Sequence, residues 1–284
     1  MALTGAPAAT DDGASLGQEP IPYAPLITPA PSPEAVSPEA SPEVRADTPA
    51  PADTTQPEAE TPAPKETAKP TPASVSGQPL SGYIIGIDPG HQAHANREKE
   101  PQSPGSSTMK NKVSSGTYGR FTGVREYEVN LQVGLAIRDS LEALGAKVLM
   151  TRTTNDIDIS NVERAQFFNP EKTDYALRLH CNGSDSASKA GAFMLIPKSH
   201  PLKDDCKRAA ELLIDAYCSA TGFKNLGVTI RSDQTGFNWC ERMIVNIEMG
   251  HMTNEKDDHM LTDKAVQKTM VQGLVNGIVA YFAS

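Results

Sequence analysis

Residues 83–91 read Tyr-Ile-Ile-Gly-Ile-Asp-Pro-Gly-His and contain the first clear element of the fold. The β-branched run predicts a short buried strand, and Asp-Pro-Gly supplies a turn at its end. The histidine that follows the turn, His91, therefore lies at the carboxyl end of a strand. In α/β proteins, that edge of the sheet is where binding sites gather.

Beyond this segment, the apolar residues alternate between strand and helix spacing. We predict strands over 147–150, 175–179, 191–196 and 243–247, and helices over 129–144, 159–168, 207–221 and 266–282. This alternation is typical of an α/β protein, so we expect a single three-layer αβα domain with a twisted, mixed but mostly parallel sheet. Residues 92–125 are rich in Gly, Ser, Asn and Lys, and we expect a long surface loop there.

The N-terminal part of the chain has a different composition. Of the 23 prolines, 17 fall within residues 1–79, together with eleven acidic and only three basic residues. Such a segment buries too little apolar surface to offset the entropy of ordering it. We therefore predict a disordered, acidic Pro/Ala/Thr/Glu-rich linker over 1–80 and a catalytic domain over 81–284. We favour a tether to an upstream anchor over an ordinary disordered leader.

Composition also limits where the protein is expected to work and which classes of partner it is expected to bind. Without a run of about 18 apolar residues, no transmembrane segment is predicted. The part after the linker is nearly neutral and has no basic patch, which argues against nucleic-acid binding. The first residues lack an export signal, and we expect that one has been removed from a protein of the cell wall, cell envelope or extracellular space. We expect a monomer.

Four ionisable residues stand at comparable places in this scheme. His91, His180 and Glu248 follow or end predicted strands, and Glu126 begins a predicted helix. Two imidazoles and one carboxylate with a fourth position open are the pattern of catalytic zinc, and a further carboxylate is then free to act as a base. Taken singly, each residue also has an ordinary structural explanation, such as helix capping for Glu126. Spacing alone does not decide between a metal site and these structural roles.

Five segments occur in the order found in one family. They are Ile85–His91, Glu126–Leu131, Thr151-Arg152 with Asn155-Asp156, Arg178-Leu-His-Cys-Asn182, and Ile247–Asn254 with Asp257 and Leu261. Together they resemble the motifs of the zinc N-acetylmuramoyl-L-alanine amidases, the amidase-3 family. Two positions depart from the family pattern. Arg178-Leu179 stands where Ser-Ile is usual, and His251 stands where an aromatic residue is usual, so we interpret His251 as a packing residue.

The resemblance implies the function and the role of each site residue. His91, Glu126 and His180 would bind one Zn²⁺, with Glu128 a weaker candidate than Glu126, and Glu248 would be the catalytic glutamate. The substrate would be peptidoglycan, cleaved by an autolysin at the amide between N-acetylmuramic acid and L-alanine. Substrate contacts are expected from Asn182, Asn238 and Trp239, although for the last two we slightly favour a packed loop over a substrate-binding role.

Two further questions stay open at this point. A zinc carboxypeptidase or deacetylase would use the same metal site on another bond, and a non-catalytic wall-binding module is a third reading. The four cysteines, Cys181, Cys206, Cys218 and Cys240, show no close pairing pattern, and we favour buried free thiols over disulfides.

Overall fold

The computed structural model describes residues 78–284. The linker predicted for 1–80 lies outside the described residues except for its last three positions. None of the helices among residues 78–284 could span a membrane.

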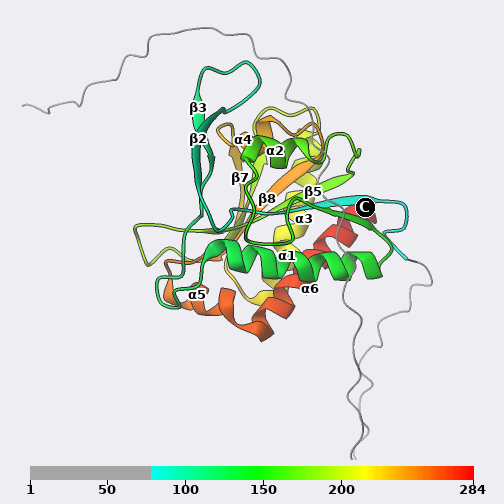
Figure 1. Cartoon of the computed structure of the whole chain (residues 1–284). Coiled ribbons are helices and arrows are strands. Elements are labelled where there is room, and N and C mark those ends of the chain that lie inside the picture. Colours follow the sequence, from blue (N-terminus) through cyan, green and yellow to red (C-terminus); the bar gives the residue numbers. More distant parts are fainter. Residues whose placement is uncertain (1–77) are drawn as a thin grey trace, which may run out of the picture. The chain divides into compact units, whose positions relative to one another are not determined.

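A six-stranded sheet forms the centre of the described part (Figure 1). Its strand order is β4-β1-β5-β8-β6-β7, and every neighbouring pair is parallel except β6 and β8. The strands are β1 (Ile84–Pro89), β4 (Lys147–Met150), β5 (Tyr175–Asn182), β6 (Ala192–Pro197), β7 (Asn225–Arg231) and β8 (Ile244–His251). The predicted α/β class with a mixed, mostly parallel sheet is confirmed.

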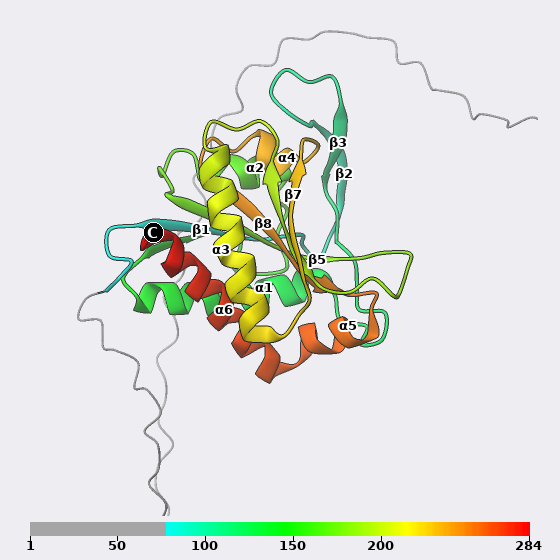
Figure 2. The same cartoon turned by 180° about the vertical axis from the view of Figure 1, so that it is seen from behind.

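One face of the sheet carries the main hydrophobic core. Helices α1 (Glu126–Ala143), α3 (Lys203–Thr221) and α6 (Lys264–Phe282) cover it, and α3 and α6 lie side by side on this face in Figure 2. Alternate strand residues, such as Ile87 and Leu179, are fully buried against them. A further helix, α5 (Glu255–Thr262), packs between α6 and β8.

The opposite face is covered by two short helices, α2 (Asn161–Gln166) and α4 (Thr235–Asn238). The residues that follow α2 pack closely on β1, because a β-carbon at Gly86 would lie 2.4 Å from the ring of Phe168. Nearer the carboxyl ends of the parallel strands, the residues on this face are polar instead of apolar. The site described below lies there, because strand alternation points Arg178 and His180 to the face opposite the main core.

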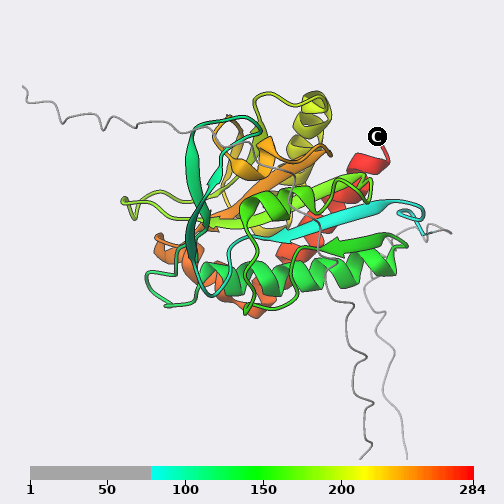
Figure 3. The ribbon, with the colours of Figure 1, turned by 45° about the horizontal axis from the view of Figure 1, so that its top comes forward.

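The prediction of one long loop over 92–125 is wrong. This stretch contains an antiparallel hairpin of β2 (Asn96–Pro101) and β3 (Met109–Val113). The hairpin rises from the domain in Figure 1 and is seen in teal at the left in Figure 3. Its strands read Asn-Arg-Glu-Lys-Glu-Pro and Met-Lys-Asn-Lys-Val, which lack the alternation of apolar residues that marks a half-buried strand.

Several boundaries also differ from the prediction. Strands β5 and β8 run three and four residues beyond their predicted ends at 179 and 247, so His180 and Glu248 lie within strands. Helix α3 ends at Thr221, as predicted, and Gly222 forms its C-cap with φ at 77°. The elements β7, α4 and α5 had no counterpart in the prediction. All four cysteines are free thiols.

Candidate metal centre

His91 follows β1 with its backbone in the left-handed region, at φ 62°, which is uncommon for a residue other than glycine. Its Nδ1 donates a hydrogen bond to the carbonyl oxygen of Ser114 at 2.9 Å. This bond fixes the ring and leaves the lone pair of Nε2 free, and Nε2 lies 3.2 Å from Oε1 of Glu126. This arrangement leaves Nε2 of His91 available to a metal ion.

Glu126 is the first residue of α1 and is only 2% exposed. Its two carboxylate oxygens accept hydrogen bonds from the backbone N–H groups of Thr117, at 2.9 Å, and Cys181, at 3.0 Å. Glu128 caps the N-terminus of α1 instead. Its Oε2 accepts a hydrogen bond from the backbone N–H of Arg125 at 3.1 Å. Of the two candidates, only Glu126 reaches the histidines.

His180 lies on β5 beside Glu126, with its Nδ1 3.3 Å from Oε1 of that carboxylate. Its Nε2 is buried and has no hydrogen-bond partner among the described residues. A buried ring nitrogen without a partner is costly unless it binds something else. The ring also requires Gly90, because a β-carbon there would lie 2.2 Å from Cε1 of His180.

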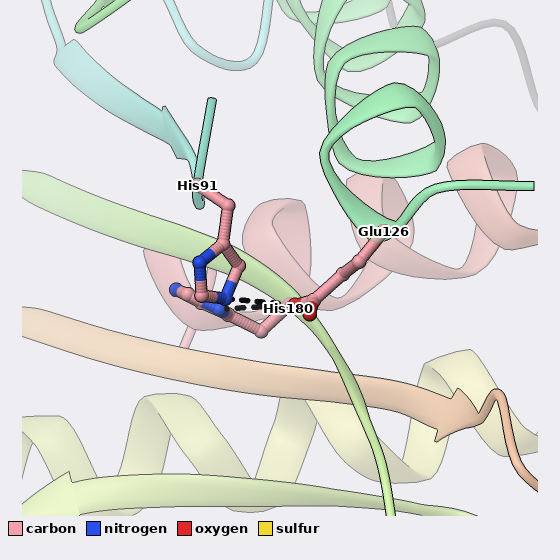
Figure 4. A group of neighbouring side chains, drawn as sticks. All are labelled: His91, Glu126 and His180. Carbon is pink, nitrogen blue, oxygen red and sulfur yellow. Dashed lines mark hydrogen bonds and ion pairs between the residues drawn. The ribbon is translucent and has the colours of Figure 1, made fainter. Parts of the chain in front are cut away.

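These three side chains converge from separate elements (Figure 4). Their candidate ligand atoms lie within 4.8 Å of one another. Burial lowers the pKa of His180 to about 4. Burial opposes the ionisation of Glu126, but His91 and His180 outweigh it and hold its pKa well below the usual range. Neutral imidazole and ionised carboxylate are the forms that bind metal, so this donor set fits a divalent cation.

Glu248 lies across from His180 in the register of β5 and β8. Its Oε1 accepts a hydrogen bond from Nδ2 of Asn246 at 3.1 Å. Burial, reinforced by the charge of Glu126, raises the pKa of Glu248 to about 8. It lines an open pocket of about 470 Å³ together with His91, Glu126 and His180. The four residues predicted from the sequence are therefore brought to one pocket.

The three expected substrate contacts are placed differently. Asn182 lines this pocket, and its amide lies 3.1 Å from Nε2 of His251. Asn238 and Trp239 point to the hairpin instead. Their side chains donate to the carbonyl oxygens of Gln102, at 3.1 Å, and Pro101, at 2.9 Å.

His251 lies away from the metal ligands and is buried, with 3% exposure. Its Nδ1 donates to the carbonyl oxygen of Gly191 at 3.0 Å, so it ties the end of β8 to the start of β6.

A buried ionic layer that the sequence interpretation did not assign lies beneath the ligands. Asp88 accepts from Arg164 and Arg178, each at 2.8 Å, and from Thr151 at 2.6 Å. Burial opposes the ionisation of Asp88, but the two guanidinium groups outweigh it and hold its pKa below the ordinary value.

Arg152 belongs to the same layer and fixes the turn that carries His91. Its guanidinium donates to the carbonyl oxygens of Pro89, at 2.7 Å, Gly90, at 3.1 Å, and Tyr127, at 2.8 Å. The end of β1 is thereby joined to the first turn of α1, which carries Glu126. The Thr151-Arg152 and Asp88-Pro89 motifs were the sequence signals for this layer.

Comparison with known proteins agrees with this geometry. The profile of the Amidase_3 family, described as N-acetylmuramoyl-L-alanine amidase, matches residues 85–280. The N-acetylmuramoyl-L-alanine amidase Rv3717 of Mycobacterium tuberculosis is 26% identical over 224 residues, which cover 75% of this chain and 91% of that protein. The N-acetylmuramoyl-L-alanine amidase LytC of Bacillus subtilis is 26% identical over 72% of this chain and 36% of its own length.

A solved structure shares the fold. The N-acetylmuramyl-L-alanine amidase Ami1 of Mycobacterium abscessus, in its apo form, superposes with a TM-score of 0.66 at 27% identity. The match covers 71% of this chain and 99% of that one.

Proposed function

The chain belongs to the family of N-acetylmuramoyl-L-alanine amidases, and we propose that it is a zinc enzyme that hydrolyses the amide between N-acetylmuramic acid and L-alanine in peptidoglycan. One observation carries the zinc part of this proposal. His91, Glu126 and His180 come from three distant parts of the chain, yet their ligand atoms lie within 4.8 Å of one another. Two imidazoles and one carboxylate are a known ligand set of catalytic zinc.

When bound, zinc would polarise the scissile carbonyl and make water a better nucleophile at neutral pH. The chain's own residues prepare that chemistry. Ser114 orients His91, and the backbone N–H groups of Thr117 and Cys181 hold the carboxylate of Glu126. Ligands fixed in this way bind a metal with little reorganisation.

Glu248 is the proton carrier in this proposal. Its carboxylate takes a proton from the attacking water and later delivers it to the leaving nitrogen of L-alanine. Asn246 holds one carboxylate oxygen of Glu248 through the 3.1 Å hydrogen bond, which limits its rotation. A cation on the neighbouring ligands would draw the raised pKa of Glu248 down towards neutrality, where a group that both accepts and donates protons works best.

The remaining expectations about substrate and location are also proposals. We place Asn182 in contact with the substrate, since it lines the pocket. Asn238 and Trp239 would act by holding the 96–113 hairpin beside the pocket, through their bonds to Gln102 and Pro101. A peptidoglycan substrate means that the protein works at the cell wall, as an exported autolysin, with residues 1–80 as its linker and 81–284 as its catalytic domain.

Two glutamates two residues apart provide a matched test. Glu126→Gln should lose bound zinc and hydrolysis of cell walls, whereas Glu128→Gln should keep both and lose about 1 kcal/mol of stability at most, as for other helix caps. Zinc is measured by elemental analysis of the purified proteins, and hydrolysis by the loss of turbidity of a cell-wall suspension. Full zinc occupancy and activity in Glu126→Gln would refute the proposed site.

A further inference from the structure

The ionic layer beneath the metal ligands contains more positive than negative charge. Three guanidinium groups lie in it, those of Arg152, Arg164 and Arg178, and each of these residues is at most 5% exposed. Asp88 is the one carboxylate to which any of them donates within the described part of the chain. Buried charges are usually paired, so this excess calls for an explanation.

The three arginines differ in how well their donors are satisfied. Arg152 and Arg164 each make five hydrogen bonds to carbonyl, amide or carboxylate oxygens. Arg178 makes one, from Nε to Oδ2 of Asp88 at 2.8 Å. A guanidinium group has five N–H donors. Both Nη groups of Arg178 therefore have no partner among the described residues.

The free end of Arg178 faces the pocket. Arg178 is one of the pocket-lining residues, and the backbone of α4 passes over its guanidinium. The backbone can approach this closely only because residue 236 is a glycine, since a β-carbon there would lie 2.2 Å from Nη1 of Arg178. The Oε1 atom of Glu248 already accepts from Asn246, and no described hydrogen bond joins Glu248 to Arg178.

Two further basic side chains line the pocket, those of Lys110 and Arg231, and Asp233 pairs with both of them, at 3.9 and 2.7 Å. Glu126 and Glu248 are the other acidic residues of the lining. An anion that enters the pocket thus meets one guanidinium, that of Arg178, whose two Nη groups have no hydrogen-bond partner among the described residues, whereas the other two basic side chains are already paired.

On the basis of the proposed function, we propose that Arg178 binds a carboxylate of the peptide stem, one residue beyond the L-alanine that is released. Arg178 and His180 are two residues apart on one face of β5, so their Cα atoms lie about 6.6–7 Å apart. A substrate peptide advances about 3.3–3.6 Å per residue, so its second residue reaches Arg178 when the scissile amide is at the ligands.

This assignment makes Arg178 a specificity residue. A guanidinium pairs with a carboxylate through two parallel charge-assisted hydrogen bonds, which a carboxamide cannot reproduce. The enzyme should therefore prefer a stem whose second residue carries a free carboxylate over one that carries the corresponding amide. We expect a preference of about 10- to 100-fold, as for other charge-assisted contacts.

The test compares two substrates that differ only in that group, N-acetylmuramoyl-L-alanyl-D-glutamate and N-acetylmuramoyl-L-alanyl-D-isoglutamine. The wild-type zinc protein should show the higher kcat/KM on the acid, with most of the difference in KM. Arg178→Gln should remove this preference, so that the ratio of kcat/KM on the acid to kcat/KM on the amide falls to about one. Thr151→Val is the matched control, because it also removes a hydrogen bond to Asp88 but does not line the pocket, and it should keep the preference.

A binding measurement separates this proposal from the proposed function. Calorimetry should show that L-alanyl-D-glutamate binds wild-type protein about tenfold or more tightly than L-alanyl-D-isoglutamine, whether or not hydrolysis is observed. Equal binding of the two dipeptides overturns the role of Arg178. So does an equal fall of kcat on both substrates in Arg178→Gln, which would mean that Arg178 acts through Glu248. If the dipeptides bind as expected but neither amide is cleaved, the proposed function fails and the anion site stands.

Discussion

Glu126 and Glu128 show what single residues reveal in the sequence and what they do not. Both stand in the first turn of α1, and composition gives no reason to prefer one. Helix geometry separates them, because residues two apart point in different directions. Glu126 turns towards the histidines, and Glu128 turns back to cap the helix. The order of motifs selected Glu126, and this is the glutamate that lies beside the histidines.

The buried arginines could not be foreseen in the same way. Arg164 is 1% exposed, yet nothing in its sequence surroundings distinguishes it from a solvent-exposed helix residue. Its burial depends on Asp88, 76 positions earlier, and such a partner becomes visible only after folding. Arg178 was noted only as a departure from a motif, and its unused donors emerge from the structure.

At Glu248, an isosteric substitution tests the proton carrier. Glu248→Gln keeps the size of the side chain but cannot accept a proton, so hydrolysis should fall by about 10²- to 10⁴-fold. Zinc should remain bound at the level of the wild type, since Glu248 is not a predicted ligand. Glu241→Gln, an exposed change just before β8, is the control and should keep full activity. Activity within a few-fold of the wild type in Glu248→Gln would contradict the assigned role.

In zinc-free protein, the difference in stability between Glu248→Gln and the wild type should depend on pH. Folding raises the pKa of Glu248 from 4.5 to about 8 through burial. The folded state therefore holds this proton more tightly than the unfolded chain, and Glu248 destabilises the fold increasingly as the pH rises from about 4.5 to about 8. Glutamine has no such cost, so Glu248→Gln should be more stable than wild type at pH 8 by about 2 kcal/mol.

Thermal melts in chelator at pH 5 and pH 8 measure this effect. The two proteins should melt at similar temperatures at pH 5, and the variant should melt higher at pH 8. A variant that melts below the wild type at pH 8 would show that Glu248 is not desolvated as described.

At the scale of elements, the register between β5 and β8 creates the site. His180 is paired directly with Glu248 because the two strands are parallel neighbours, although the residues are far apart in the chain. The sequence predicted both strands from their apolar runs, and it predicted that their carboxyl ends meet. It could not predict that β8 sits beside β5, since strand order depends on how helices cross over the sheet.

The elements that were missed have weak apolar patterns. Strand β7 is an edge strand in which every residue is exposed or partly exposed, so its sequence lacks a buried face. Helix α5 offered one usable signal. Asn254 caps it by accepting from the backbone N–H of Asp257 at 3.1 Å, and an Asn followed by acidic residues often marks the start of a helix.

The hairpin of β2 and β3 should depend on its side-chain anchors. Asn238→Ala removes the hydrogen bond to Gln102 and should weaken the attachment by about 1 kcal/mol. Hydrogen exchange measured by mass spectrometry should become faster in peptides from 96–113 and stay unchanged in the central strands. Asn276→Ala, an exposed change on α6, should leave exchange in the hairpin unchanged. Unaltered hairpin exchange in Asn238→Ala would remove the anchoring role.

At the scale of the whole molecule, the predicted division between linker and catalytic domain is open to a direct test. The match with the solved Ami1 structure covers 71% of this chain and 99% of the Ami1 chain. That Ami1 chain therefore folds without a segment that corresponds to the remaining residues of this chain. A protein that begins at residue 78 should cleave a soluble muropeptide with a kcat/KM within about twofold of the full chain, because domains carry their own cores. A loss of tenfold or more would assign residues 1–77 a part in catalysis.

We propose that a zinc ion held by His91, Glu126 and His180 serves to cut the amide between N-acetylmuramic acid and L-alanine. Mass spectrometry of peptidoglycan digested by the full chain, with and without a zinc chelator, tests it most directly. We predict stem peptides that begin with a free L-alanine amine and glycan strands with free lactyl carboxylates, no products in chelator, and recovery on adding zinc. Release of single amino acids or acetate, or undiminished cleavage in chelator, would contradict the claim.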